Sequence, residues 1–280
     1  MRYPARVSVS RIVFVLVPLA LSATGSAQSV LLRLKPPVGA KRSYISKMTM
    51  TMSSSAPMPG MNGPMVITTT TPMEIRVVKR VGNVTTMETK TGKPTVTLPK
   101  NSPMAGMKSQ MEKQGGGVVG TVSINEFGEV KGFDAKGSGQ NAAMAQQMSG
   151  GVLSGLQGVS LPKRAVKVGD TWSSSIDMGK AVGMGMGAPG ASQKMPVTFR
   201  LASIENKGGK RLARVAMTMK GSMKVNAGGQ QVPITMNMSG HSLFEIATGL
   251  TVGTSMTSDS TFAVMGNTMK QHMVMSMTAR

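Results

Sequence analysis

The sequence feature that most constrains the fold is a repeated alternation of methionine with small or polar residues. Because successive side chains of a β-strand point to opposite faces, this period of two predicts strands that each carry their thioethers on one face. The chain has 29 methionines but only 6 phenylalanines, 2 tyrosines and 1 tryptophan, so methionine must fill much of any hydrophobic core. The alternating groups are Met48, Met50 and Met52; Met217 and Met219; Met236 and Met238; and Met273, Met275 and Met277.

Other segments also read as strands separated by turns. Residues 44–52 and 65–78 have strand composition, and Pro72 in the second run predicts a bulge or a sheet edge. Ser102 is a suitable N-cap for a short helix over 104–113. We therefore predict a mostly β fold, with antiparallel sheets arranged as a half-barrel or a sandwich and with one or two short helices.

The order of turns suggests an internal duplication. A hairpin turn at Gly82 corresponds to one at 206–209, and a turn at Gly128 corresponds to one at Gly249. The predicted organisation is a signal peptide (1–27), a first β half (28–134), a Gly-, Ala- and Gln-rich linker that has room for a short helix (135–160) and a second β half (161–280).

The second half opens with LPKRAVKVGDTW over 161–172, which contains the only tryptophan. Val168 and Gly169 before Trp172 parallel a Val-Gly pair before Tyr44. With its strand order, this entry resembles an uncharacterised family of secreted bacterial β-rich proteins (the DUF6263 family). It is more distantly similar to the LolA-like half-barrels that carry lipoproteins or lipids. The resemblance implies a curved sheet with an apolar ligand, and it assigns no functional residue.

The first residues predict export. Arg2, Arg6 and Arg11 precede an apolar run over 12–21, and Ala27 suits the last position before a signal-peptide cleavage site. No later segment is apolar over a membrane-spanning length, so no transmembrane segment is expected after cleavage. The chain has no cysteine, so an exported protein of this sequence relies on its core rather than on disulfides. The expected location is the bacterial periplasm or the exterior.

The net charge of +21 favours contact with anionic surfaces of the cell envelope. A nucleic-acid partner is not expected, because export and the scarcity of aromatic residues both argue against base stacking. The same dispersed charge also serves to keep a methionine-rich protein soluble.

The residues with catalytic potential form no recognisable constellation, so enzyme activity is not expected. His241 and His272 lie in predicted strands, and Asp170 is expected to cap the turn before Trp172. Glu126 and Glu129 bracket a hairpin turn, where carboxylates are normally solvated.

The methionines leave three roles open. They fill a core that lacks aromatic residues, or they line an apolar cavity that adapts to acyl chains. As an alternative, methionines in loops bind Cu(I), a soft ion that thioethers prefer, with His241 and His272 able to add imidazole. The predicted function is thus an exported, non-enzymatic envelope protein without a cofactor. It is a binding or structural module whose methionine-lined apolar face suits a lipid-like ligand, with a periplasmic Cu(I)-binding protein as the alternative. The copper ligands would be Met58, Met61, Met65, Met184 and Met186.

Overall fold

The computed structural model describes residues 29–56, 63–100, 102, 104–114, 116–136, 159–177, 194–227, 230–264 and 267–280. The predicted signal peptide and most of the predicted linker lie outside these ranges. The first part of the chain forms β1 (Lys41–Ser54), β2 (Met65–Val81), β3 (Val84–Thr91), β4 (Thr95–Thr97), the 3-10 turn η1 (Ala105–Met107), α1 (Lys108–Gln114), β5 (Val119–Asn125) and β6 (Val130–Lys136). The second part forms β7 (Thr171–Asp177), β8 (Lys194–Lys207), β9 (Lys210–Ala227), β10 (Gln230–Glu245), β11 (Thr251–Val264) and β12 (Asn267–Ala279).

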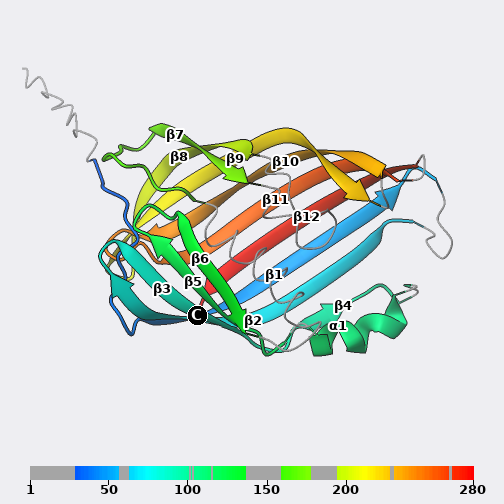
Figure 1. The fold of residues 1–280 in the computed structure, drawn as a ribbon, viewed down its shortest axis with the longest axis horizontal. Helices are drawn as coiled ribbons and strands as arrows, with labels where there is room; N and C mark the ends of the chain where they lie inside the picture. The colour runs from blue at the N-terminus through cyan, green and yellow to red at the C-terminus, as the bar shows by residue number, and fades with distance from the viewer. Residues whose placement is uncertain are drawn as a thin grey trace, which may run out of the picture.

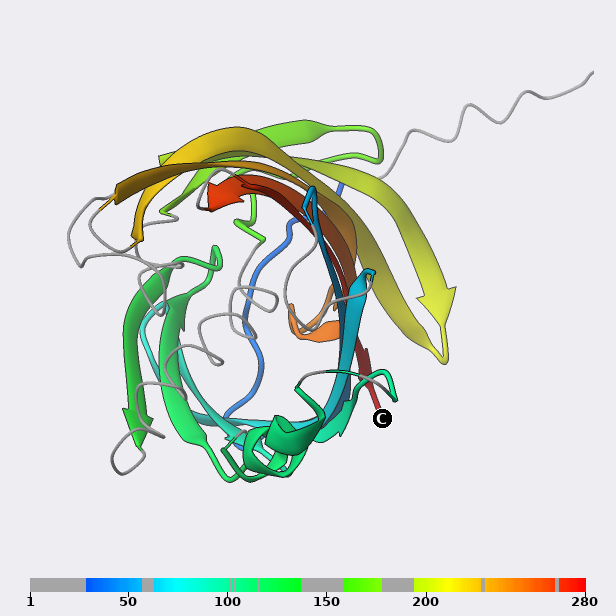
Figure 2. The ribbon, with the colours of Figure 1, turned by 90° about the vertical axis from the view of Figure 1, so that its right-hand side faces the viewer.

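These strands make one 12-stranded sheet, in the order β6-β5-β3-β2-β1-β12-β11-β10-β9-β8-β7, with β4 paired to β2 beside this path. The antiparallel pairing of β1 with β12, where Tyr44 lies opposite Ala279, joins the two parts of the chain into a continuous sheet (Figure 1). Seen from its end, the sheet curls into an incomplete cylinder (Figure 2). The predicted mostly β fold is confirmed, in its half-barrel form.

The predicted hairpins are present, and their turns explain four glycines. Gly82, Gly128, Gly208 and Gly249 have φ angles of 55°, 85°, 56° and 70°, in the left-handed region that favours glycine. They connect β2 to β3, β5 to β6, β8 to β9 and β10 to β11. Whether the two halves arose by duplication stays a prediction.

Strand register places every methionine of the described strands on the same face of the sheet. Met48 lies opposite Met275, Met275 opposite Met256, and the alternation continues in phase across the neighbouring strands. This face is the concave one, because the coil that precedes β1 lies inside the curl (Figure 2). The period of two in the sequence thus becomes a shared, inward-facing methionine surface.

Part of the concave face is sealed by coil. Val30 and Leu32 before β1, together with Leu161 and Val166 before β7, pack with strand residues into one buried cluster. Val30 and Val166 are also joined by an isolated antiparallel bridge. The strand members that they cover include Phe199, Leu201, Val215 and Phe244, and we call this part the covered region.

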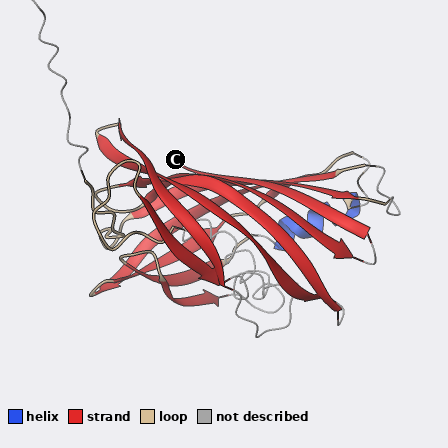
Figure 3. Ribbon diagram, turned by 90° about the horizontal axis from the view of Figure 1, so that it is seen from above, coloured by secondary structure: helices blue, strands red, loops and turns tan. Residues whose placement is uncertain are grey.

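The short helix lies beside β4 at one end of the long strands (Figures 1 and 3). Ser102 accepts a hydrogen bond from the Met104 amide, but the residue that caps the first turn is Met104, so the predicted cap at Ser102 is wrong. The first turn is 3-10 rather than α-helical. Glu112 of α1 accepts a hydrogen bond from the Val96 amide at 3.0 Å and thereby covers the outer edge of β4.

The prediction for Pro72 is confirmed in part, as a local edge rather than a bulge. Pro72 lies inside the sheet, opposite Ile45 of β1, and the bulge of β2 falls at Val77 to Lys79. The sheet tolerates the missing amide because Pro72 lies where the partner of β2 changes from β3 to β4.

Candidate ligand-binding face

Another part of the concave face carries a group of half-buried methionines on β1, β2, β10, β11 and β12. We call this group the methionine platform. Its side chains differ in exposure from the methionines of the core, of which Met219 is only 1% exposed. The members of the platform are Met48, Met50, Met52, Met65, Met236, Met238, Met256, Met273 and Met275.

Charged residues avoid the platform. Along the described parts of β1, β2 and β8–β12, the charged side chains between the strand ends alternate onto the convex face. Polar residues that share the concave face with the platform are neutral, such as Ser258, Ser260 and Gln271. The platform is therefore an apolar surface on a strongly basic protein. The convex charges are Lys47, Glu74, Arg76, Arg200, Arg214, Lys220, Lys224, Asp259 and Lys270.

One thioether of the platform is used as a hydrogen-bond acceptor. The Nε2 atom of Gln271 donates to Sδ of Met50 at 3.3 Å. Gln271 is on β12 and Met50 is on β1, so the sulfur of Met50 is turned towards the neighbouring strand.

A buried polar group fixes the covered end of the sheet. Glu245 accepts hydrogen bonds from Arg42 at 2.7 Å and from Lys210 at 3.3 Å. Burial alone would raise the pKa of Glu245, but the two cations outweigh it and hold the pKa below its usual range. The Tyr44 hydroxyl donates to the Thr251 carbonyl at 2.8 Å, and burial raises the pKa of Tyr44 to about 12.

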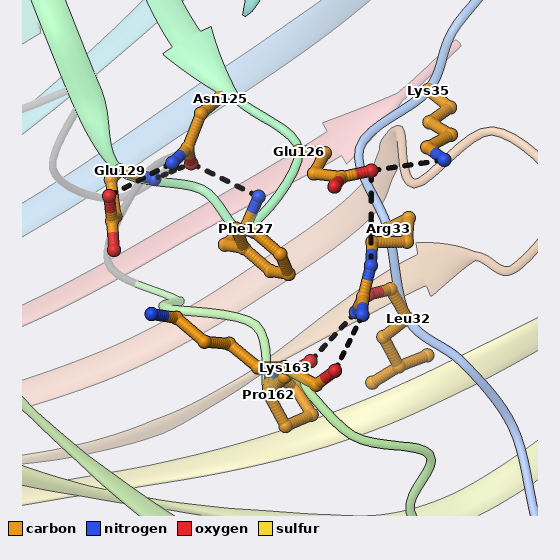
Figure 4. Close-up of polar contacts among 9 residues, drawn as sticks. All are labelled: Leu32, Arg33, Lys35, Asn125, Glu126, Phe127, Glu129, Pro162 and Lys163. Carbon is orange, nitrogen blue, oxygen red and sulfur yellow. Dashed lines mark hydrogen bonds and ion pairs between the residues drawn. The ribbon is translucent and has the colours of Figure 1, made fainter. Parts of the chain in front are cut away.

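Arg33 joins the segments that close this end (Figure 4). Its guanidinium donates to the Pro162 carbonyl at 2.7 Å and to the Lys163 carbonyl at 2.8 Å. It also lies 4.5 Å from the centre of the Phe127 ring, which is a cation–π distance. One side chain thus ties the coil before β1 to the coil before β7 and to the β5–β6 turn.

The two glutamates of the β5–β6 turn differ. Glu126 is only 19% exposed and forms an ion pair with Lys35 at 3.0 Å, so its predicted solvated position is wrong. Glu129 is 47% exposed, as predicted. The side-chain oxygen of Asn125 accepts hydrogen bonds from the amides of Phe127 and Glu129, and it thereby shapes the turn.

The segment around the tryptophan serves packing. Asp170 accepts a hydrogen bond from the Lys167 amide at 3.1 Å, which confirms its predicted capping role. Trp172 stacks on Phe199 with ring centres 5.8 Å apart and donates from its indole to the Ser160 carbonyl. These contacts extend the covered region to the sheet edge at β7.

A small cavity lies between the strands and the covering coil, near Tyr44, Thr89 and Leu161. Its volume is about 40 Å³, enough for about three water molecules. The hydroxyl of Thr89 is buried and has no hydrogen-bond partner. A cavity of this size does not hold an acyl chain, so the platform is the larger candidate surface.

Most of the residues predicted for copper lie outside the described residues: Met58, Met61, Met184 and Met186. Met65 is described, and it is the first residue of β2, opposite Met52 on the platform, rather than part of a loop. Within the described ranges, no group of three or more His, Asp and Glu residues could hold a metal ion.

The histidines do not join the platform. His241 is half-buried on β10, and burial lowers its pKa. The Nδ1 atom of His272 lies 2.7 Å from Oδ1 of Asp259. Both histidines alternate onto the convex face, so neither adds imidazole to the strand methionines.

Comparisons with known proteins give only distant neighbours. A chain of lipovitellin, from a structure concerned with lipid–protein interactions in that protein, aligns with a TM-score of 0.46 and 12% identity over 88% of this chain and 25% of its own. DynF from the dynemicin biosynthesis pathway of Micromonospora chersina aligns with a TM-score of 0.22 and 7% identity over 90% of this chain and 85% of its own. The chain thus spans a quarter of the lipovitellin chain.

No protein-family model and no curated protein matches the sequence, so the resemblance to secreted half-barrel families stays a prediction. No helix in the described part of the chain is both long and apolar enough to cross a membrane.

Proposed function

We propose that the protein is an exported binding module that holds a lipid-like, uncharged portion of a ligand against the methionine platform. The observation that carries this proposal is the contrast on one concave face between sealed residues and half-buried methionines. When a ligand removes a partly uncovered apolar surface from water, the free energy of the system falls, and this favours binding.

The chemistry of the side chains suits a ligand of variable shape. Methionine is unbranched and has a polarizable thioether, so it follows irregular surfaces better than branched side chains do. Fully burying one such side chain is worth about 1.5–3 kcal/mol, and the platform members are already half-buried, so each gains a part of this. Several methionines acting together supply useful affinity without a charged contact.

The convex face supports a second part of the proposal. Its charges are mainly basic and its other residues are mainly threonine and serine, such as Thr49, Thr218 and Thr257. A surface of this kind favours contact with anionic components of an envelope, while the concave face holds the ligand.

The test uses two glutamates placed on opposite faces of the same strand. Met275 belongs to the platform, whereas its neighbour Val274 is 38% exposed on the convex face. We expect Met275→Glu to weaken binding of the neutral fluorophore N-phenyl-1-naphthylamine by about tenfold or more, because a tenfold loss needs only 1.4 kcal/mol and a buried, unpaired carboxylate costs more. Val274→Glu should bind the probe like the unmodified protein.

Fluorescence titration gives the affinities, and thermal melting shows whether both variants fold. Equal binding by folded Met275→Glu and Val274→Glu would contradict the proposal. Native mass spectrometry of protein from its own host should also show co-purified lipid, displaced by the fluorophore.

A further inference from the structure

The sulfur atoms of the platform can bind a metal ion through their lone pairs, in addition to forming part of an apolar surface. Met48 on β1 lies directly opposite Met275 on β12, and Met50 lies directly opposite Met273. Directly opposite residues of an antiparallel pair have Cβ atoms about 4.5–5.5 Å apart, within reach of each other's long side chains. These four side chains form a block of two rows, which we call the methionine tetrad.

The tetrad is accessible, and its described neighbours on the same face are uncharged. All four methionines are half-buried, so an ion reaches them without unfolding of the core. The neighbours on the same face are Thr69 and Ile67 on β2 and Met256 and Ser258 on β11, which carry no charge. The tetrad therefore offers thioether sulfur and no carboxylate or imidazole.

The sulfur of Met50 is directed towards β12. The hydrogen bond from Gln271 of β12 to Sδ of Met50 turns this sulfur across the strand pair rather than along β1. Met273 lies between Gln271 and Met275 along the same face of β12. The Met50 sulfur thus lies near β12, and an ion that binds the tetrad would replace the Gln271 amide as its partner.

From this geometry we infer that the tetrad binds one soft monovalent cation, Cu(I) or Ag(I). Thioether ligands select Cu(I) over the hard cations that prefer oxygen, and the chain has no cysteine to compete for it. The site lies between β1 and β12, which are neighbours in the middle of the sheet. A bound ion would therefore link the two parts of the chain. This inference uses sulfur lone pairs and is independent of the proposed ligand binding, which uses apolar surface.

The test replaces sulfur and keeps the apolar surface. In the variant Met48→Leu, Met50→Leu, Met273→Leu and Met275→Leu, leucine is similar in volume, and such exchanges usually cost less than about 1.5 kcal/mol each. Met104→Leu, Met107→Leu and Met111→Leu is the control, because it removes thioethers near α1 and leaves the tetrad intact. Each full-length protein is titrated with Cu(I), without oxygen, against a chromogenic Cu(I) chelator.

We expect the unmodified protein and the α1 control to withdraw one equivalent of Cu(I) from the chelator. The tetrad variant should lose affinity by about tenfold or more, because even partners that only orient a ligand are worth about 10–100-fold. Its binding of N-phenyl-1-naphthylamine should stay within about twofold of the original, since its surface remains apolar.

Three results would overturn the inference: no competition by the unmodified protein, unchanged competition by the tetrad variant, or an equal loss in the α1 control. X-ray absorption of the Cu(I)-loaded unmodified protein adds a readout that needs no variant, and it should show a first shell of sulfur. A shell of nitrogen or oxygen would also overturn it. If the unmodified protein binds Cu(I) but does not bind the fluorophore, this result would instead count against the proposed function.

Discussion

The covered region and the methionine platform lie on the same concave face and share β10, but their side chains differ in exposure. Phe199, Leu201 and Val215 have shapes that fix their packing, and coil from two distant segments seals them. Met48 and Met275 are half-buried and lie outside that cluster. The covered region also buries methionines, such as Met217 and Met219, so exposure rather than residue type separates the two regions.

The largest effect is expected when one side chain in each region is truncated to alanine. Phe199→Ala should lower the free energy of unfolding by about 3–5 kcal/mol, because it opens a sealed cavity and removes the stack with Trp172. Met275→Ala should cost about 2 kcal/mol or less, because its side chain is already half in water. Urea unfolding measures both, and equal losses would mean that the platform is part of the core.

A second pair of variants tests the close contact that holds coil over the covered region. At Gly249, with φ of 70°, an added Cβ would lie 2.1 Å from the Arg33 carbonyl oxygen. Gly208 has φ of 56° and open space around it. Gly249→Ala should therefore cost about 2–3 kcal/mol, and Gly208→Ala only about 1–2 kcal/mol of backbone strain. Similar losses in urea unfolding would show that the coil shifts freely.

A third pair uses pH. Since the folded pKa of Glu245 is lowered, its contribution to stability is present above the pKa of the unfolded chain and is lost as pH falls through the folded pKa. Glu245→Gln should cost about 2 kcal/mol at neutral pH and flatten this acid dependence. Glu129→Gln, at an exposed ion pair, should change stability by about 0.5 kcal/mol or less. An acid profile unchanged by Glu245→Gln would rule out this role.

The smallest effect on stability is expected from brief treatment with hydrogen peroxide. Oxidation to sulfoxide follows exposure, so peptide mass spectrometry should find it at Met48, Met273 and Met275 before Met217 and Met219. The melting temperature should change little, because the platform contributes little to the core. Early oxidation of the buried pair would contradict the assigned burial.

Local sequence signals predicted much of this fold. The alternation of Met273, Met275 and Met277 predicted a strand with a single methionine face, and Gly82 and Gly128 predicted hairpins, because period and turn chemistry are local properties. The signal at Ser102 predicted the short helix, although Ser102 is not its cap, and Asp170 predicted the turn before β7.

Long-range contacts could not be predicted in this way. Pairing of Tyr44 with Ala279, and the cover that Leu32 and Leu161 provide, depend on segments far apart in the chain. The burial of Glu126 depends on Lys35, which no turn pattern indicates. The sequence therefore predicted a methionine-lined face of the sheet. Only the tertiary structure shows which of these methionines are half-buried.

The β1–β12 pairing also dictates when the molecule can be completed. One edge of β1 stays unpaired until β12 has been synthesised, and all the other described strands of the sheet come before β12 in the sequence. An unfinished chain exposes that edge, rich in methionine and threonine, to any other strand nearby. We therefore expect less aggregation during synthesis when copies of the chain are kept apart until β12 is available to pair with β1.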